Sequence, residues 1–280
     1  MSYNELEQRG TADFPIELYL IDGSHPKYEM SAHWHNEIEL IRVKSGTLNI
    51  RLNNNAYCVK ENEIIFINPE TIHQASPVDC LYECIVFQPY IIPPTSNGSV
   101  YFIDSLNNRE YTIDEYHQDI SSPFSKAINA VFDTMAEKSS GYKFKVIGAL
   151  YNLFGEIIDM HLYKSVHTSH ISDDKNVTKL KSVLSYIRTN FDTQITLDDM
   201  ASAAGMSPKY FCYFFKEMTA KTPVEYLNLY RIEKASAKLL KSDLSVTAIA
   251  FSCGFNDLSY FIKTFKQVKG VTPAKFRKSI

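Results

Sequence analysis

The sequence predicts an α+β fold with two domains, a small β-barrel with a helical segment and an all-α C-terminal half. Short β-rich runs separated by turn residues alternate over residues 14–102. Two amphipathic helical patterns follow between residues 122 and 164. A further helical pattern occurs twice between residues 196 and 276, which indicates a duplicated helical unit.

The 280-residue chain has a globular composition, with 45% hydrophobic and 22% charged residues. This balance excludes intrinsic disorder and fibrous repeats, and the length fits two domains of about 100–200 residues each. No stretch approaches the roughly 18 consecutive apolar residues of a membrane span, and residues 1–10 lack the layout of a secretory signal. Five scattered cysteines without a CxxC pair argue against a disulfide framework or a Cys-rich zinc site. We therefore expect a cytoplasmic protein that does not associate with membranes.

The net charge of −3 averages two halves of opposite sign. Residues 1–170 hold 12 Lys and Arg against 22 Asp and Glu, a net −10, and they contain all eight histidines. Residues 171–280 hold 17 basic against 10 acidic residues, a net +7. The sign changes within a polar stretch that is typical of a linker. We therefore expect domains at 1–165 and 177–280 joined by a linker at 166–176, and the basic domain suits a nucleic-acid partner.

The N-terminal β-rich runs have the length and punctuation of a sandwich or barrel. Turn signals stand at Ser45-Gly46, at Asn53-Asn54-Asn55 and at Asn68-Pro69. The runs recur at about ten-residue spacing, as is typical of such folds. The predicted strands are Ile16–Leu20, Ile38–Val43, Thr47–Leu52, Ala56–Val59, Ile64–Ile67 and Tyr82–Phe87.

Two helices are expected after the barrel. The first opens at Ser122-Pro123 and runs to Lys138, and the second runs from Lys143 to Lys164. Each carries apolar residues along one side, which suits packing on the barrel or an interface with another chain. These positions are Ala127, Ile128, Val131, Phe132 and Met135 in the first helix, and Ile147, Leu150, Phe154, Ile157, Ile158 and His161 in the second.

Residues 196–227 and 245–276 are two copies of one pattern. The copies match at a shift of 49 residues, and at a shift of 50 after one inserted residue. The matched positions are Thr196 with Ser245, Met200 with Ile249, Ala201 with Ala250, Gly205 with Gly254, Tyr210-Phe211 with Tyr260-Phe261, Phe215-Lys216 with Phe265-Lys266, and Thr222-Pro223 with Thr272-Pro273.

Each copy has the layout of a helix-turn-helix, and the two units lie at about 196–217 and 245–267. A short helix with several alanines ends at Gly205 or Gly254, which can adopt the left-handed conformation. A second helix with an aromatic inner face follows. A plain helical hairpin repeat, as in a solenoid, is the alternative. The presence of only two copies, together with the basic surplus, favours the helix-turn-helix.

The second helix of each unit is expected to start at Ser207 in the first copy and at Asn256 or Asp257 in the second. Between the units, Pro223–Leu240 fits one amphipathic helix about 27 Å long. This length is close to the roughly 34 Å between successive major-groove faces of B-DNA. A helix of this length would position the second helices of the two units in adjacent major grooves of one duplex. A further helix from about Val177 covers the first unit.

The C-terminal half resembles the DNA-binding region of the AraC/XylS transcriptional regulators, over about residues 177–280. The resemblance implies a regulator that binds double-stranded promoter DNA, responds to a small-molecule effector, contacts RNA polymerase and forms a homodimer through a helical segment at about 121–165. The matching residues are Ala201 to Gly205, Met206-Ser207, Tyr210-Phe211 and Phe214-Phe215-Lys216 in the first copy, and Ile249-Ala250, Cys253-Gly254-Phe255, Tyr260-Phe261, Thr264-Phe265-Lys266 and Thr272-Pro273 in the second.

By the same resemblance, the second helix of each unit presents side chains to a major groove. Ile262 and Leu258 suit thymine methyl groups, and Lys263 suits guanine edges. Solvated charge is the alternative role for the lysines. The expected DNA-contacting residues are Ser207, Lys209, Cys212, Tyr213, Lys216, Leu258, Ser259, Ile262, Lys263 and Lys266.

The N-terminal half resembles a cupin, which is a jelly-roll barrel. His33 to Glu39, with Gly46, has the His-x-His-(x)3-Glu-(x)6-Gly form of the first cupin motif, and Pro69 to His73 resembles the second. Cupin enzymes hold a metal through a set that would here be His33, His35, Glu39 and His73. The first three share one parity on the first strand and can face one lumen. The second motif departs from the pattern, because Thr71 replaces the usual Gly and the Pro-to-His spacing is short.

Three roles are open for His33, His35, Glu39 and His73. In the first, they line an effector pocket without metal, as is common in the regulators that the chain resembles. In the second, they bind a divalent metal. In the third, His33 and Glu39 satisfy hydrogen bonds of backbone groups. The resemblance implies an effector such as a sugar, no required cofactor and no catalytic residues, so we expect a regulator and not an enzyme. The rival function is a metal-dependent cupin enzyme fused to a DNA-binding domain.

Overall fold

The structure, a computed structural model, describes residues 9–11, 13–25, 28–92, 97–108, 110–166 and 175–278. They form two compact units, one N-terminal and one that starts at Lys175. The predicted α+β fold with two domains is confirmed. Residues 167–174 of the predicted linker lie outside the described residues, and residues 175 and 176 belong to a helix. None of the helices in the described ranges is long and apolar enough to cross a membrane.

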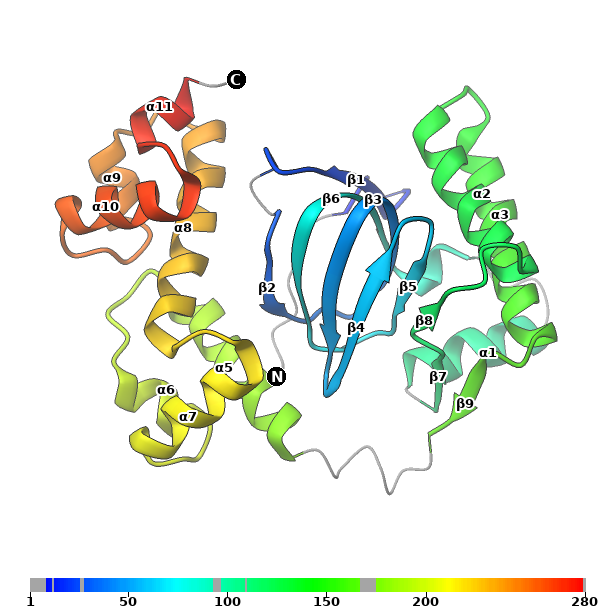
Figure 1. Cartoon of the computed structure of the whole chain (residues 1–280), viewed down its shortest axis with the longest axis horizontal. Helices are drawn as coiled ribbons and strands as arrows, with labels where there is room; N and C mark the ends of the chain where they lie inside the picture. Colours follow the sequence, from blue (N-terminus) through cyan, green and yellow to red (C-terminus); the bar gives the residue numbers. More distant parts are fainter. Residues whose placement is uncertain are drawn as a thin grey trace. The chain divides into compact units, whose positions relative to one another are not determined.

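The N-terminal unit is built on one antiparallel sheet with strand order β1-β6-β3-β5-β8, to which β2 adds beside β6 and β4 beside β3. A second, two-stranded sheet pairs β7 with β9. The elements, labelled in Figure 1, are β1 (Ile16–Ile21), β2 (Met30–His33), β3 (Ile38–Leu52), β4 (Asn55–Lys60), β5 (Ile64–Ile67), β6 (His73–Phe87), a 3-10 turn (Pro89–Ile91), α1 (Asn97–Asn107), β7 (Tyr111–Ile113), β8 (Tyr116–His117), α2 (Pro123–Glu137), α3 (Tyr142–Asp159) and β9 (Tyr163–Ser165).

The two strands predicted on either side of Ser45-Gly46 are one strand, β3, so the predicted turn at that point is wrong. β3 and β6 pair along almost their whole length, and their register shifts around Ser45. Gly46 has a φ of +75°, and a Cβ there would lie 2.1 Å from the Asp79 carbonyl oxygen on β6. The residues that signal a turn therefore form a β-bulge, at which both strands bend together.

The sheet separates two apolar cores, because successive side chains of a strand point to opposite faces. Ile38 and Leu40 of β3 belong to the core under the helices, whereas Ile41 and Val43 belong to a core enclosed by the strands themselves. Every residue of β5 is buried, so this strand contributes to both cores. This arrangement is the barrel-like domain that the sequence predicts.

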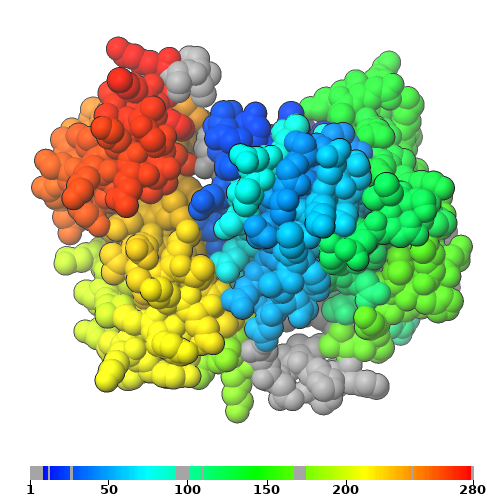
Figure 2. Space-filling view, in the orientation of Figure 1, coloured from blue at the N-terminus to red at the C-terminus, as the bar shows by residue number. Residues whose placement is uncertain are grey.

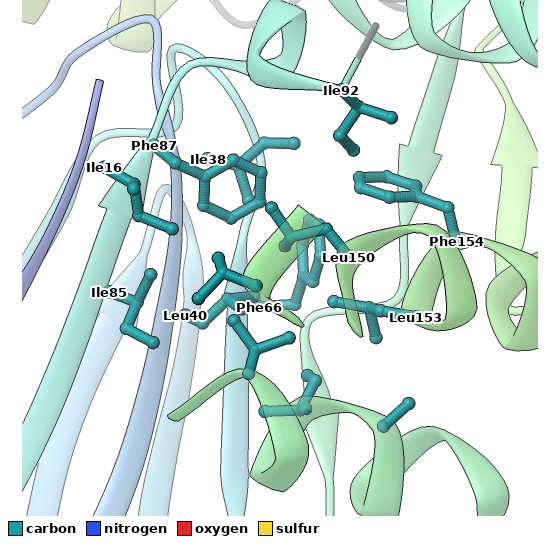
Figure 3. Packing of buried hydrophobic residues seen from close by; sticks show 14 of the residues in the cluster. Ile16, Ile38, Leu40, Phe66, Ile85, Phe87, Ile92, Leu150, Leu153 and Phe154 are labelled. Carbon is teal, nitrogen blue, oxygen red and sulfur yellow. The ribbon is translucent and has the colours of Figure 1, made fainter. Parts of the chain in front are cut away.

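Helices α2 and α3 cover the outer face of the sheet. Leu150, Leu153 and Phe154 of α3 point towards the sheet residues Phe66 and Ile38 (Figure 3). In the space-filling view, the green atoms of the helical region lie directly against the blue and cyan atoms of the strands (Figure 2). The apolar stripe predicted on these helices therefore packs mainly within the N-terminal unit.

Arg42 fixes α2 to the sheet through a nearly buried polar network. Its guanidinium donates to Glu83 on β6 at 2.8 Å and to Asn129 and Asp133 on α2 at 2.9 Å each. The same group lies 4.6 Å from the ring centre of Phe132. Two charge-assisted hydrogen-bond partners on different elements hold this face in one register.

The second of the two predicted helices ends earlier than expected, so its predicted end at Lys164 is wrong. α3 stops at Asp159, and His161 adopts a left-handed φ of 55°. Lys164 lies in β9, which pairs with β7. The pairing partner is about 50 residues away in the sequence, so no local pattern reveals it. The sequence also does not predict α1, which begins within residues 14–102, a range whose pattern predicts strands.

The C-terminal unit is entirely helical, and its elements follow the prediction closely. Helix α8 runs between α6 and α7 at one end and α9 and α10 at the other (Figure 1). Its 19 residues span about 28 Å. The helices are α5 (Lys175–Asn190), α6 (Leu197–Ala203), α7 (Pro208–Thr219), α8 (Pro223–Lys241), α9 (Val246–Phe251), α10 (Leu258–Lys269) and α11 (Pro273–Arg277).

Side-chain caps set the starts of these helices. Thr196 and Thr222 form reciprocal capping boxes with Asp199 and Glu225, in which each partner satisfies a backbone N–H of the other. Asp257 accepts the Tyr260 N–H at 2.6 Å, which settles the start of α10 in favour of Asp257 over Asn256. Local chemistry therefore fixes the boundaries that the sequence predicts.

The glycines at the two turns adopt the same backbone conformation in different surroundings. Gly205 has a φ of +63° and nothing within 4 Å of an added Cβ. Gly254 has a φ of +80°, and a Cβ there would lie 2.1 Å from the Phe191 carbonyl oxygen and 2.8 Å from the Arg231 guanidinium. The second turn therefore needs glycine for close packing as well as for its φ.

We expect Gly254→Ala to destabilise the C-terminal unit more than Gly205→Ala. The left-handed conformation alone costs an alanine about 1–2 kcal/mol. Gly254→Ala should add about 1–3 kcal/mol, because it displaces buried hydrogen bonds of a charged group. Thermal unfolding followed by far-UV circular dichroism measures both variants, and fluorescence of Trp34, the only tryptophan, reports the N-terminal unit separately. Equal losses of stability in the two variants would contradict this account.

Candidate functional site

Helix α7 turns a polar face to solvent because its aromatic residues Phe211, Phe214 and Phe215 are buried. The predicted contact residues Ser207, Lys209, Tyr213 and Lys216 are exposed, and Cys212 is half-buried. Tyr213 is the most exposed aromatic residue of this helix, at 68%. One face of α7 thus presents a phenol and two lysines at its exposed surface.

Helix α10 repeats the arrangement around buried Phe261 and Phe265. Ser259, Ile262, Lys263 and Lys266 are exposed. Leu258, the remaining predicted contact residue of this helix, is partly buried and packs against the core formed with α8 and α9. Its side chain is therefore less exposed than those of the other four.

Two tyrosines at matching positions of the repeat extend both exposed faces. Tyr210 of α7 is 57% exposed and Tyr260 of α10 is 48% exposed. The Tyr260 hydroxyl accepts a hydrogen bond from Asn228 of α8 at 2.8 Å. The internal repeat pairs these tyrosines, which are not among the predicted contact residues. Their position one residue before a buried Phe is the signal that could have identified them.

Arg231 of α8 joins the two helix-turn-helix units. It is 8% exposed, and its Nε and Nη2 donate at 2.7 Å to the carbonyl oxygens of Phe191 and Thr193, between α5 and α6. The guanidinium also lies 5.8 Å from the ring centre of Phe255, directly after the turn glycine of the second unit. One side chain therefore contacts the entrance of the first unit and the turn of the second.

The second candidate site is a buried cluster in the N-terminal unit. His33, His35, Glu39 and His73 each offer one ligand atom, and these atoms all lie within 4.8 Å of one another. His35, Glu39 and His73 are 2%, 3% and 0% exposed, and His33 is half-buried. The structure therefore brings together all four residues that the sequence singles out.

The prediction that His33, His35 and Glu39 come together because they share one parity on a single strand is wrong. His33 ends β2, His35 lies in the connection and Glu39 is in β3, so the three do not share one strand. Instead, β2 pairs with β6, and His33 is the direct cross-strand partner of His73. The ring centres of these two histidines are 4.1 Å apart. Sheet pairing between distant segments creates the cluster.

Each histidine ring of the cluster is oriented by a backbone carbonyl. The Nδ1 atoms of His33 and His73 lie 2.8 Å from the carbonyl oxygens of Ser31 and Thr71. His35 Nδ1 lies 3.2 Å from the Glu37 carbonyl oxygen. A carbonyl oxygen only accepts, so each Nδ1 carries a proton and donates it. The Nδ1 atom of each of the three rings is thereby a donor to the backbone.

The Glu39 carboxylate lies among the rings. Its Oε2 is 3.0 Å from His35 Nε2 and 3.3 Å from His73 Nε2. Burial raises the pKa of Glu39, but interactions with His35 and His73 outweigh it and hold the pKa well below its usual range. Burial and the neighbouring Glu39 raise the pKa of the Cys84 thiol on β6. The cluster thus concentrates one negative charge and three imidazoles in a nearly dry environment.

Comparison with known proteins matches both units. Residues 15–154 match the family described as AraC-like ligand binding domain, and residues 200–279 match the family described as Helix-turn-helix domain. The chain is 26% identical to YdeC, an uncharacterised HTH-type transcriptional regulator of Bacillus subtilis, over 98% of this chain and 95% of that protein. It is 23% identical to the transcriptional activator RhaS of Mannheimia succiniciproducens, over 92% and 93% of the two chains. It is also 23% identical to the melibiose operon regulatory protein of Escherichia coli, over 94% and 91%.

Proposed function

The chain belongs to the AraC family of DNA-binding transcription regulators, and we propose that it reads paired promoter sites with α7 and α10 under the control of a small polar effector. The observation that carries this proposal is the duplicated helix-turn-helix. Each copy buries its aromatic residues and exposes a face with lysine, hydroxyl and tyrosine side chains. Helix α8 and Arg231 connect the two copies into one unit.

The exposed side chains support moderate sequence specificity. Base recognition in the major groove relies most on Arg, Asn and Gln, which form bidentate pairs with guanine or adenine. The candidate faces carry none of these among the predicted contacts. Lys263 suits a guanine edge and Ile262 a thymine methyl group, whereas Lys216 and Lys266 suit phosphates. DNA shape and binding of two chains would then supply the remaining discrimination.

The effector that we propose belongs to the class of sugars and similar polar metabolites. One relative that matches over nearly the whole chain, the melibiose operon regulatory protein, has a name that refers to a sugar. Effector binding would shift the population between two states of the regulator and so change its affinity for DNA. The related proteins are regulators, and we propose that this chain has no enzymatic activity. We place it in the cytoplasm with the promoter DNA and RNA polymerase.

A homodimer is supported by a second seam on α3. Phe144, Gly148, Tyr151, Gly155 and Ile158 follow the alternating four- and three-residue spacing of a heptad. Phe144 is 88% and Ile158 is 39% exposed, and nothing lies within 4 Å of a Cβ added to either glycine. A glycine inside a helix costs about 0.5–1 kcal/mol relative to alanine, and small residues allow two helices to approach closely. We therefore place the dimer contact on this seam.

We expect Lys266→Ala to weaken binding of a promoter fragment and to reduce the salt dependence of that binding. The slope of log K against log salt should become less steep by about 0.9, because one phosphate contact is lost. Fluorescence anisotropy over a series of salt concentrations measures this slope. Lys145→Ala, on the exposed surface of α3, is the control and should leave the slope unchanged. A wild-type slope near zero would refute the assignment of phosphate contacts.

We expect Gly155→Leu to convert a dimer into a monomer, because the added side chain separates the two α3 helices. Sedimentation equilibrium measures the mass, and Gly23→Leu adds the same side chain at an exposed loop of the N-terminal unit as a control. Retention of the wild-type dimer by Gly155→Leu would place the contact elsewhere.

A further inference from the structure

We propose that Asn228 of α8 and Tyr260 of α10 form a neutral phosphate-binding pair, which fixes the second reading helix against the DNA backbone. The proposal rests on the proposed function, because it adds a contact to the duplex that α7 and α10 read. Neither residue is among the predicted DNA contacts. The contact would consist of hydrogen bonds from uncharged groups, beside the charged contacts of the lysines.

The pair joins two helices at the surface of the C-terminal unit. Helices α8 and α10 lie side by side (Figure 1). Asn228 Nδ2 donates to the Tyr260 hydroxyl at 2.8 Å, between residues that are 32 positions apart in the sequence. Tyr260 is 48% exposed and Asn228 is half-buried, so a ligand can reach both polar groups.

The hydrogen bond within the pair leaves two donors for a ligand. A tyrosine hydroxyl has one O–H donor and also accepts, and an asparagine amide has two N–H donors. The bond uses the hydroxyl as an acceptor and takes one N–H of the amide. No group in the described ranges accepts the Tyr260 O–H or the second N–H of Asn228. Donation by the amide also polarises the hydroxyl and makes it a stronger donor.

The location of the pair identifies the ligand as a phosphate. Tyr260 is the third residue of α10, and the exposed Lys263, a predicted base contact, follows one turn later. The N-terminal residues of the second helix of a helix-turn-helix enter the major groove. A pair that connects this helix end to another helix lies at the edge of the groove, where the phosphates are. Phosphate oxygens only accept, and Tyr and Asn are among the side chains that bind them.

The pair is also connected to the joint between the two helix-turn-helix units. The ring centre of Phe255 lies 6.2 Å from that of Tyr260 and 5.8 Å from the Arg231 guanidinium. Arg231 follows Asn228 by three residues, so the two side chains lie on one side of α8. Because Arg231 binds carbonyl groups at the entrance of the first unit, a phosphate on the pair is held in register with both units.

The first unit offers a natural comparison. Tyr210 occupies the matching position on α7 and is 57% exposed. Within the part of the chain that the structure describes, its hydroxyl forms no hydrogen bond with another residue. A single phenol and a hydrogen-bonded pair therefore occupy equivalent positions of the repeat, and Tyr210 is the matched control for Tyr260.

The test uses the full chain and a promoter fragment that it selects, with fluorescence anisotropy over a series of salt concentrations. Tyr260→Phe removes the O–H and keeps the ring beside Phe255. We expect about 10-fold weaker binding, the loss of one hydrogen bond to a charged group. The slope of log K against log salt should stay unchanged, because an uncharged donor neutralises no phosphate. Tyr210→Phe should leave both the affinity and the slope at their wild-type values.

Asn228→Asp separates phosphate binding from a purely structural role of the pair. The carboxylate keeps a hydrogen bond with Tyr260, but it accepts the O–H and repels a phosphate. We expect an unchanged melting temperature of the helical unit, measured by circular dichroism, and an affinity at least as low as that of Tyr260→Phe. A pair that only holds α8 against α10 would leave DNA affinity unchanged in Asn228→Asp.

Replacement of single phosphates by uncharged methylphosphonates locates the contact. At one phosphate of the bound site, the loss of affinity should be clearly larger in wild type than in Tyr260→Phe, because the two changes remove the same interaction. Wild-type affinity in Tyr260→Phe and Asn228→Asp, or equal phosphate profiles in wild type and Tyr260→Phe, would overturn the pair and leave DNA reading by α7 and α10 intact. A wild-type chain whose binding does not depend on salt would refute the proposed function, and the pair with it.

Discussion

The contact between Arg231 and the carbonyl oxygens of Phe191 and Thr193 is the constraint on which the helical unit depends. Two helix-turn-helix units read one duplex together only if their spacing is fixed. Helix α8 supplies a length of about 28 Å, but a helix alone leaves each unit able to rotate around its end. The planar guanidinium binds two carbonyl groups at once and faces Phe255 of the other unit, so it restricts that rotation. The same guanidinium packs against Gly254, where a Cβ atom would lie too close to it.

The helical unit could be predicted almost completely from its sequence because its determinants are local. Thr196, Thr222 and Asp257 cap helices within three residues, and Gly205 and Gly254 end them. The duplication adds an independent check, since each copy predicts the other. Leu258 is the exception, because its partial burial depends on packing against α8 and α9, which no local pattern encodes.

The N-terminal unit was predicted less accurately because its determinants are distant in the sequence. A Ser-Gly pair reads as a turn, but β6 bends along with β3 and makes it a bulge. The residues after α3 form β9 because they pair with β7. The local helical periodicity of the sequence does not predict this pairing. The cupin-like motif predicts the histidine cluster correctly, although the assignment of its first three residues to one strand is wrong. Pairing of β2 with β6 places His33 opposite His73. The alternation of residues along one strand does not predict which distant strand pairs with it.

The two units divide the chemistry between them. The basic half, with 17 basic against 10 acidic residues, carries the exposed lysines of α7 and α10, and the acidic half contains buried polar networks around Arg42 and Glu39. The most direct test of the central claim is hydroxyl-radical footprinting of the full chain on a genomic fragment that it selects. The account predicts, for each chain, two protected segments on one face of the duplex, about one helical turn or 10 base pairs apart. Protection of a single segment per chain, or of segments on opposite faces, would contradict it.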